Sequence, residues 1–321
     1  MTIRPTSVYS GPVEALAALR EHVGSRAEVV HVAPEPTAVG EALARADAFL
    51  DASMKVRVEE PMIDAAPRLR VVAVAATGAD HIDDEALSRR DIPLLTLRGQ
   101  REVLRELTPA AEHSWLLLMA CARQLRTALE HVLEGQWNRA DFPGIMLRGK
   151  VLGIVGCGRI GTWMSRYAQA FGMTCIGYDP HADGWPEGVE RTSLEDLLER
   201  ADFVSVHVPL TKANTRFFDR GCFDRMKPGA VFVNTSRGDL VDERALLDAL
   251  RSGRVAAAGV DVLTGEPHVQ DHPLRNYALT HPNVLITPHI GGFSPDAVRV
   301  VVRYSADRIL QHFASSPTQV A

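Results

Sequence analysis

Short apolar segments alternate with amphipathic segments along nearly the whole chain. In the first hundred residues the apolar segments predict strands, the first clear one at Glu28–Val32 and others at 48–50, 71–75 and 93–96. Short strands separated by helical patterns are typical of βα units that feed a parallel sheet. The first third of the chain is therefore predicted to form an α/β domain.

A longer helical pattern follows. It predicts one helix from Glu112 to Arg126, after which residues 135–139 are polar. The helical period places four of its residues on the buried side: Leu116, Leu117, Met119 and Ala120.

A second series of βα units begins at Lys150. Its strands are predicted at 151–155, 174–178, 203–206, 230–233, 256–260 and 284–286. Thr192 and Glu195 have the spacing of a capping box, and Asp242 and Gly253 bound another helix. A last helix is predicted over 295–313. The whole pattern predicts an α/β protein with two doubly wound parallel sheets.

Length and composition agree with this organisation. The 321 residues suit two domains better than one, and 46 % hydrophobic residues supply ample core. A net charge of −5 with scattered basic residues does not indicate nucleic-acid binding. No apolar segment approaches a membrane span, and the first residues lack the apolar run of a signal peptide.

The cysteines are scattered and include no CxxC pair. They are expected to be reduced core thiols of a cytoplasmic protein, with no catalytic role and no metal site. The four are Cys121, Cys157, Cys175 and Cys222.

The segment "VLGIVGCGRIG" carries the first chemical signal. Gly156, Gly158 and Gly161 have G-x-G-x-x-G spacing, and they follow an apolar strand and open a helix. In that context the glycines permit a tight turn, approach to a pyrophosphate, and close helix–strand packing. The helix N-terminus then offers unpaired N–H groups to the phosphates. A plain βα turn is the alternative.

Asp179 strengthens the nucleotide interpretation. It ends the next strand, 18 residues after Gly161, close to the roughly 20 expected of an acid that binds the adenosine ribose. A carboxylate there favours NAD over NADP, because it repels a 2′-phosphate. Arg159 could neutralise the pyrophosphate, or it could be a solvated loop charge.

Three later strands end in polar residues. These are Arg237 in "NTSRGDL", Glu266 in "LTGEP" and His289 in "TPHIGG". Because carboxyl ends of parallel strands share one edge, the three side chains are expected to converge. Each alone could be structural, but together they favour catalysis. Gly238, which follows Arg237, is expected to let the backbone turn close to a nicotinamide.

This trio fits the oxidation of a 2-hydroxy acid or the reduction of a 2-oxo acid. A guanidinium binds the substrate carboxylate with two parallel hydrogen bonds. A histidine moves a proton to or from the substrate oxygen while hydride moves to or from carbon. A nearby carboxylate orients the imidazole and supports its cationic form.

Several segments together resemble the D-isomer-specific 2-hydroxyacid dehydrogenases, which include phosphoglycerate, glycerate and D-lactate dehydrogenases. The similarity covers nearly the whole chain. It lies in "AATGADHID", "AAEHSWLLLMACARQL", "LRGKVLGIVGCGRIG", "HVPLTKANTRFF", "MKPGAVFVNTSRGDLVDERALLDAL", "GVDVLTGEP" and "TPHIGG".

The resemblance implies roles for individual residues. Arg237 would bind substrate, Glu266 would support the histidine, and His289 would be the acid/base. Asp261 would meet the nicotinamide carboxamide. The substrate carboxylate would meet the backbone of Ala76, Thr77 and Gly78. The expected NAD-binding set is Gly156, Gly158, Arg159, Ile160, Gly161, Asp179, Val208, Pro209, Thr235, Ser236, Asp261, His289 and Gly291.

The resemblance also implies an organisation. Residues 1–100 and 291–321 would form the substrate domain, and 101–290 an inserted NAD-binding Rossmann domain, with the cleft between them. The protein would be a cytoplasmic homodimer with a small-molecule substrate and no nucleic-acid or membrane partner. An NAD-sensing co-repressor on the same scaffold is an alternative. An enzyme for formate or phosphite is a second one, although formate gives a histidine proton acceptor no obvious role.

Two departures from the family pattern bear on the substrate. Asp51 stands where phosphoglycerate dehydrogenases often have an arginine, which disfavours phosphoglycerate. The loop from Leu97 to Arg101 replaces an Asn-Thr-Pro turn that many members have. Its arginines could contact a larger or anionic substrate, or the loop could be a solvated hinge.

Overall fold

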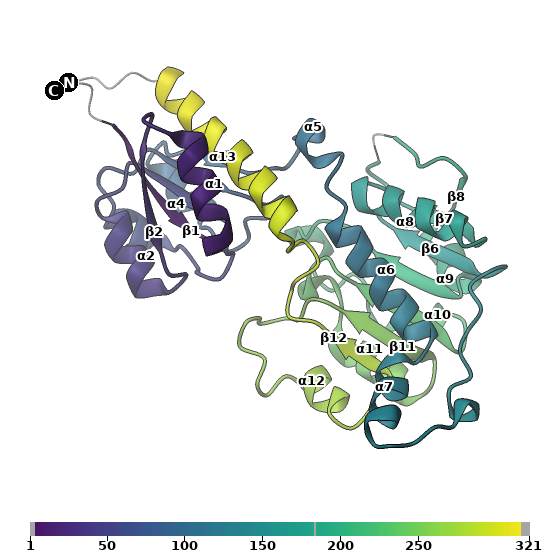
Figure 1. The fold of residues 1–321 in the computed structure, drawn as a ribbon. Coiled ribbons are helices and arrows are strands. Elements are labelled where there is room, and N and C mark those ends of the chain that lie inside the picture. Colours follow the sequence, from purple (N-terminus) through teal and green to yellow (C-terminus); the bar gives the residue numbers. More distant parts are fainter. Residues whose placement is uncertain (1–3, 183, 316–321) are drawn as a thin grey trace. The chain divides into compact units, whose positions relative to one another are not determined.

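The computed structural model describes residues 4–182 and 184–315. The chain divides into two compact units, each built around its own parallel sheet (Figure 1). Unit 1 holds the chain up to Leu107 together with the chain from Phe293 onward, and unit 2 is Thr108–Gly292. Two doubly wound parallel sheets were expected from the sequence, and the structure confirms that fold class.

Unit 1 has a five-stranded sheet in the order β2-β1-β3-β4-β5, with every pairing parallel. Its strands are β1 Thr6–Ser10, β2 Glu28–Val32, β3 Ala48–Asp51, β4 Val71–Val74 and β5 Leu94–Leu95. Its helices are α1 Val13–Val23, α2 Pro36–Leu43, α3 Glu60–Asp64, α4 Asp84–Arg89, α5 Arg101–Leu104 and α13 Pro295–Ser315.

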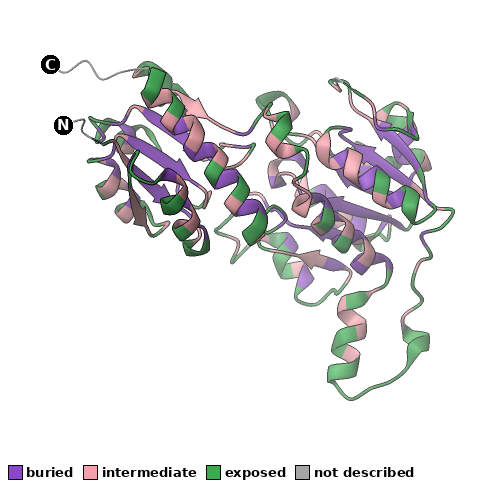
Figure 2. Ribbon diagram, turned by 45° about the horizontal axis from the view of Figure 1, so that its top comes forward, coloured by how far each residue is buried: buried purple, intermediate pink, exposed green. Residues whose placement is uncertain are grey.

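Successive side chains of these strands alternate between two cores. On one face Phe49 and Val72 pack against α2, α3 and α4. On the other face Leu50 and Ala73 pack against α1 and α13. The buried strands lie between these helix layers, whose outer surfaces are exposed (Figure 2). The helix nearest the end of the chain therefore covers a sheet made from its first hundred residues.

Unit 2 has a seven-stranded parallel sheet in the order β12-β11-β10-β9-β6-β7-β8. Its strands are β6 Val151–Val155, β7 Thr174–Tyr178, β8 Val189–Arg191, β9 Phe203–Val206, β10 Ala230–Asn234, β11 Val255–Val260 and β12 Val284–Ile286. Its α-helices are α6 Pro109–Ala122, α7 Leu125–Leu133, α8 Arg159–Ala170, α9 Leu194–Arg200, α10 Arg220–Arg225, α11 Glu243–Arg251 and α12 Pro273–Ala278. Short 3-10 turns are η1 Arg139–Asp141, η2 Lys212–Asn214 and η3 Gly238–Leu240.

Two cores again flank this sheet. One contains Phe218, Phe223 and Phe232, whose rings lie 4.9–5.3 Å apart. The other packs α6 and α8 against the opposite face, with Leu118 and Met164 fully buried. Strand order reverses between β6 and β9, so the crevice at their carboxyl ends is the expected ligand position in such a sheet.

The predicted helix from Glu112 to Arg126 is in fact two helices. Gln124 takes a left-handed conformation, with φ 49°, and separates α6 from α7. The predicted buried face was also partly wrong, because Leu116 is exposed and Leu118 is buried instead.

Helix α7 and the segment that follows it extend from unit 2 as an arm, residues 125–146, whose surface is largely exposed (Figures 1 and 2). Leu133 and Trp137 on this arm are 86 % and 89 % exposed.

Two smaller predictions also differ from the structure. Strand β1 was not predicted, although it lies inside the sheet between β2 and β3. The helix expected to be capped by Thr192 is capped one residue later, where Ser193 accepts a hydrogen bond from the Asp196 N–H at 3.1 Å. Thr192 bonds the Asp196 side chain instead.

Candidate active site

The predicted nucleotide-binding and catalytic residues of unit 2 all lie at the carboxyl edge of the seven-stranded sheet. The glycine loop follows β6, and Asp179 follows β7. Val208 and Pro209 follow β9, and Arg237 follows β10. The loops that carry Glu266 and His289 follow β11 and β12, which are neighbours in the sheet.

The glycine loop fits a dinucleotide. A Cβ at Gly156 would lie 2.6 Å from the His207 carbonyl oxygen, and Gly156 has φ +97°. A Cβ at Gly161 would lie 2.1 Å from the Gly156 carbonyl oxygen. Gly158 has no neighbouring atom within 4 Å of such a position, so space remains beside it. Two glycines thus permit the close packing, and the middle one leaves room for a pyrophosphate at the start of the 12-residue helix α8.

Asp179 ties the end of β7 to this loop. Its Oδ2 accepts a hydrogen bond from the Cys157 N–H at 2.9 Å, and its Oδ1 accepts one from the His181 N–H at 2.9 Å. An ionised carboxylate has about four acceptor positions, so capacity remains for ribose hydroxyls. The side chain of Cys157 is buried behind the loop, and burial raises the pKa of its thiol to about 12.

The loop that carries Arg237 is held by its own side chains. The Asn234 side chain donates to the Arg237 carbonyl at 2.9 Å and accepts from the Ser236 N–H at 3.0 Å. The Ser236 hydroxyl donates to the Val206 carbonyl at 2.9 Å, which links the loop to β9. Arg237 is half-buried, and its Nη1 donates to the Ser236 carbonyl at 2.8 Å.

Gly238 is required by the protein's own packing. A Cβ at this position would lie 2.2 Å from the backbone of Leu263 and Thr264. The glycine therefore permits close approach of the loop after β11. This contact packs the Arg237 loop against the segment that leads to Glu266.

The structure brings His289 and Glu266 together. His289 Nδ1 lies 2.6 Å from Glu266 Oε1, and the two side chains are 29 % and 32 % exposed. His289 has a left-handed backbone, with φ 53°, which is uncommon for a residue with a Cβ. With Nδ1 directed at the carboxylate, Nε2 is the nitrogen placed to exchange a proton with a substrate.

Asp261 holds the backbone around His289. Its Oδ1 accepts from the Ile290 N–H at 2.9 Å, its Oδ2 accepts from the Gly291 N–H at 2.7 Å, and its carbonyl accepts from the His289 N–H at 2.8 Å. The carboxylate is 1 % exposed. Three successive N–H groups are therefore bound by one residue, which stabilises the unusual conformation of His289.

Sequence reasoning missed two residues of α6 that contact these loops. His113 Nε2 lies 2.8 Å from the Thr287 hydroxyl, and the Ser114 hydroxyl lies 2.7 Å from that of Thr235. The available signal was His113 and Ser114 in the "AAEHSWLLLM" segment, which directly precede the apolar part of the helix.

In unit 1, Ala76, Thr77 and Gly78 lie in the loop after β4, at the carboxyl edge of the five-stranded sheet. The Ala76 carbonyl accepts from the Leu97 N–H at 2.9 Å, Thr77 is exposed and Gly78 is buried. They belong to a different unit from Arg237.

Asp51, at the end of β3, is a buried structural carboxylate. It accepts from the Ser53 N–H at 3.0 Å, the Ser53 hydroxyl at 2.8 Å and the Met54 N–H at 3.0 Å. His81 Nε2 lies 2.8 Å from its Oδ2, and the Asp51 side chain is 3 % exposed. Donors of the same unit thus occupy both oxygens.

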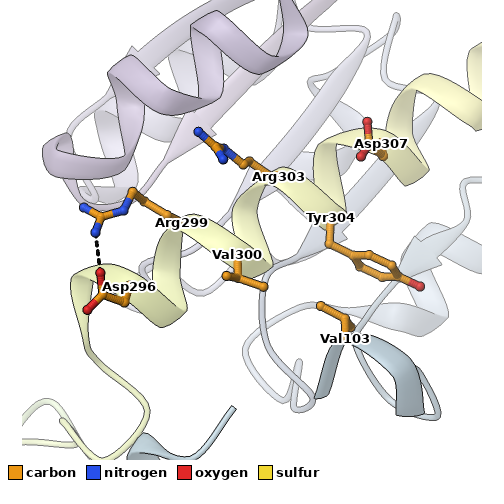
Figure 3. A pocket seen from close by; sticks show the side chains of 7 residues that line it. All are labelled: Val103, Asp296, Arg299, Val300, Arg303, Tyr304 and Asp307. Carbon is orange, nitrogen blue, oxygen red and sulfur yellow. Dashed lines mark hydrogen bonds and ion pairs between the residues drawn. The ribbon is translucent and has the colours of Figure 1, made fainter. Parts of the chain in front are cut away.

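The Leu97–Arg101 loop contains a turn at Gly99, with φ +77°, and leads into α5. Beyond it, an open hollow runs along one face of α13 (Figure 3). There Arg299 pairs with Asp296, and the Tyr304 hydroxyl donates to Gln100 Oε1 at 2.5 Å. The residues that line the hollow are Val103, Asp296, Arg299, Val300, Arg303, Tyr304 and Asp307. None of the predicted site residues is among them.

Residues 4–182 and 184–315 contain neither a metal cluster nor a membrane-spanning helix. No group of three or more His, Cys, Asp or Glu side chains there is arranged to hold a metal ion. Over the same residues, no helix has the length and apolar character needed to cross a membrane.

The chain belongs to the D-isomer-specific 2-hydroxyacid dehydrogenase family. Residues 115–291 match the NAD-binding domain of that family, and residues 8–133 match its catalytic domain. Unit 2 is accordingly an NAD-binding domain.

Several relatives are similar over most of the chain. A D-3-phosphoglycerate dehydrogenase of Mycobacterium tuberculosis is 38 % identical over 86 % of this chain, but the match spans only 51 % of that protein. A hydroxypyruvate reductase of Thermotoga maritima is 37 % identical, covering 76 % of this chain and 78 % of the relative. A glyoxylate reductase of Korarchaeum cryptofilum is 40 % identical, covering 79 % and 76 %. The chain therefore spans about half the length of the first of these relatives. These names are those of enzymes, and they give the co-repressor alternative no support.

Solved structures agree on the fold. A protein of Thermus thermophilus is 33 % identical, with a TM-score of 0.83 over 98 % of this chain and 100 % of that chain. The D-lactate dehydrogenase of Escherichia coli has a TM-score of 0.83 over 98 % of each chain, and at 23 % identity it supports the fold alone.

Proposed function

We propose that this protein is an NAD-dependent 2-hydroxyacid dehydrogenase. The observation that carries the proposal is the contact of 2.6 Å between His289 Nδ1 and Glu266 Oε1, at the edge that also carries Arg237 and the glycine loop. An acid/base pair and a guanidinium beside a dinucleotide loop meet the needs of hydride transfer to a 2-oxo acid. Unit 1 is proposed to be the substrate domain, with Ala76–Gly78 binding the substrate carboxylate.

The proposed mechanism assigns one task to each group. NADH, when bound, supplies the hydride that reaches the carbonyl carbon. Arg237 binds the substrate carboxylate and fixes its orientation through the planar fork of the guanidinium. His289 Nε2 donates a proton to the carbonyl oxygen as it becomes a hydroxyl. Glu266 orients the imidazole and stabilises its protonated form through the hydrogen bond at Nδ1.

Cofactor choice is assigned to Asp179, whose remaining acceptor positions favour ribose hydroxyls and whose charge repels a 2′-phosphate. NADH is expected to give a higher kcat/KM than NADPH. Asp179→Ala should reduce the difference in kcat/KM between the two cofactors, mainly by weakening the binding of NADH. Equal kcat/KM values for the two cofactors in the wild type would contradict the assignment.

The substrate is proposed to be an unphosphorylated 2-oxo acid. Its support is Asp51, which takes the place of an arginine found in many phosphoglycerate dehydrogenases. This residue is an acid whose oxygens are already occupied by Ser53, Met54 and His81. It therefore offers no positive charge to a phosphate group.

The deciding experiment is turnover with NADH and a panel of glyoxylate, hydroxypyruvate, pyruvate, 2-oxoisocaproate and phosphohydroxypyruvate. NADH is expected to be oxidised in the presence of at least one of the unphosphorylated acids. His289→Ala is the matched control, and it should lose this activity. NADH binding without turnover of any acid would overturn the proposal. Preference for phosphohydroxypyruvate would overturn only the substrate class.

The homodimer is part of the same proposal, and its support is the exposed arm. Apolar side chains such as Leu129, Leu133 and Trp137 are exposed together there, which is typical of a surface that another chain covers. Light scattering after gel filtration should give twice the 35.1 kDa chain mass. Leu133→Glu should give the monomer mass, and a monomeric wild type would exclude the dimer.

A cytoplasmic location is proposed from the cysteines. All four are free thiols, as is usual in a reducing compartment. Fractionation with compartment markers tests it, and recovery of the protein outside the cytoplasm would contradict it.

A further inference from the structure

We propose that His113 and Ser114, neighbours on α6, are positioning residues that hold the two catalytic loops of unit 2 in a fixed arrangement. The inference rests on the proposed function, because it assigns His289 to one loop and Arg237 to the other. His113 contacts the loop after β12, and Ser114 contacts the loop after β10. One rigid helix would thus set the distance between the proton donor and the carboxylate-binding group.

The hydrogen-bond directions at His113 are fixed by its neighbours. The Thr287 hydroxyl donates its single hydrogen to Asp261 Oδ1 at 2.5 Å. It must therefore accept at its contact of 2.8 Å with His113 Nε2, so that nitrogen carries a hydrogen. The same nitrogen lies 3.3 Å from Asp261 Oδ1. His113 consequently donates a hydrogen bond to Thr287, and its ring nitrogen also lies beside the Asp261 carboxylate.

This contact reaches His289 through Asp261. The Asp261 carboxylate holds the N–H groups of Ile290 and Gly291, and its carbonyl holds that of His289. A Cβ at Gly291 would lie 2.9 Å from Asp261 Oδ2 and 3.7 Å from His113 Cδ2, so the loop lies directly against α6. Loss of the N–H donor at His113 would therefore loosen Asp261, which maintains the left-handed backbone of His289.

The contact at Ser114 is directed in a similar way. Its hydroxyl donates to the Ala110 carbonyl at 2.6 Å. The Thr235 hydroxyl therefore donates to Ser114 Oγ across 2.7 Å, in a fully buried position. Thr235 lies between Asn234, the last residue of β10, and Ser236, whose carbonyl accepts a hydrogen bond from Arg237. The helix thereby fixes the start of the Arg237 loop.

Helix α6 is suited to this task because it cannot shift easily on the sheet. A Cβ at Gly259 of β11 would lie 2.9 Å from Leu117 Cβ, so helix and strand are in close contact. Leu118 is fully buried in the same core. The two polar side chains lie on this well-packed helix and contact the loops after β10 and β12, the strands on either side of β11.

The test compares kcat, KM for the best 2-oxo acid, NADH affinity and melting temperature among variants. His113→Ala should lower kcat roughly 10- to 100-fold, since a displacement of about 1 Å in a reacting group can cost about 100-fold. His113→Gln keeps an N–H donor and should recover most of that loss. Ser114→Ala should mainly raise KM, because it loosens the loop that binds the substrate carboxylate. NADH affinity should fall by less than kcat/KM in all three, because the pyrophosphate and the adenosine ribose are assigned to Gly156–Gly161 and Asp179, which neither residue contacts.

Leu118→Val is the matched control, because it removes one buried carbon from the same helix without touching either loop. It should lower the melting temperature and leave kcat and KM unchanged. The inference is overturned if His113→Gln is as impaired as His113→Ala, if Leu118→Val reproduces their kinetics, or if NADH affinity falls by more than kcat/KM. Ser114→Ala removes a single oxygen, so it tests the proposal even if His113→Ala does not fold. A wild type without turnover would instead contradict the proposed function.

Discussion

Arg237 stands one residue beyond the well-bonded turn that Asn234 and Ser236 form at the end of β10. Its proposed partner is a carboxylate, which a guanidinium binds with two parallel hydrogen bonds. Arg237→Lys keeps the charge and loses this fork. A lost charge-assisted hydrogen bond is worth about 1.5–3 kcal/mol, so kcat/KM should fall roughly 10- to 150-fold.

In the same variant NADH affinity should stay the same, because the pyrophosphate is assigned to Gly156–Gly161. Steady-state kinetics with the best 2-oxo acid and NADH fluorescence titration measure the two effects. Full activity in Arg237→Lys would make Arg237 a structural residue. A loss of NADH affinity larger than the loss of kcat/KM would make it a cofactor-binding residue.

Glu266 gives a second prediction at this scale. Its carboxylate lies 2.6 Å from His289 Nδ1, where it orients the imidazole that donates the proton. Glu266→Gln removes the charge of that carboxylate, so kcat for reduction should fall while NADH affinity stays the same. Steady-state kinetics and NADH fluorescence titration measure the two effects. An unchanged kcat would show that Glu266 does not support His289.

Side chains that follow strands could be predicted, and side chains that reach across the sheet edge could not. Arg237, Glu266 and His289 each lie in the loop that follows an apolar strand, so topology alone places them at one edge. His113 and Ser114 are on a helix, and their partners Thr287 and Thr235 are more than 100 residues away along the chain. Nothing in the sequence pattern specifies such a pairing.

At the scale of elements, the turn between β6 and α8 offers a matched pair of substitutions. Gly161→Ala would place a methyl group 2.1 Å from the Gly156 carbonyl oxygen. It should destabilise unit 2 by about 1–3 kcal/mol, as overpacking usually does, and weaken NADH binding. Gly158→Ala meets no protein atom within 4 Å, so it should keep the melting temperature and weaken NADH binding alone. Equal melting temperatures for both variants would contradict this account.

Element prediction failed where the local signal was weak. Strand β1, "TSVYS", has only Val8 and Tyr9 as apolar residues, yet both are buried because β2 and β3 flank it. The break between α6 and α7 falls at Arg123-Gln124, which includes neither glycine nor proline. The left-handed conformation of Gln124 is therefore a product of tertiary packing, which a helical period does not record.

At the scale of the whole molecule, His207 makes stability depend on pH. The residue is half-buried, but its Nδ1 is fully buried without a hydrogen-bond partner, and burial of the ring lowers its pKa to about 3. The unfolded chain binds a proton near pH 6.5 that the native state does not bind. The free energy of unfolding is therefore not reduced by His207 above that pH, and it falls as the pH drops from about 6.5 to about 3.

Between pH 7 and pH 5 this group alone should cost about 2 kcal/mol, at about 1.4 kcal/mol per pH unit below its ordinary pKa. The glutamine of His207→Gln does not bind a proton in this range. The free energy of unfolding of the variant should therefore fall by about 2 kcal/mol less than that of the wild type between pH 7 and pH 5. Urea unfolding of both proteins at the two pH values measures the difference. Parallel losses in the two proteins would contradict the burial of a neutral histidine.

The overall architecture was the most predictable level. Alternating apolar and amphipathic segments in two series predicted two doubly wound parallel sheets, and both are present. The pattern works because strands such as Ala230–Asn234 are buried on both faces and read as continuous apolar runs.

Helix α13 has a consequence for the order in which the protein can fold during synthesis. Unit 2 is a continuous segment, so a ribosome that has released Gly292 has delivered everything this unit needs. Unit 1 begins earlier but must wait for α13, whose Val298, Val302 and Ile309 cover one face of its sheet. The part that is translated first is therefore completed last. Until then, helix α1 covers only part of the apolar face that Leu50 and Ala73 share, and chaperones would be expected to bind the rest on the nascent chain.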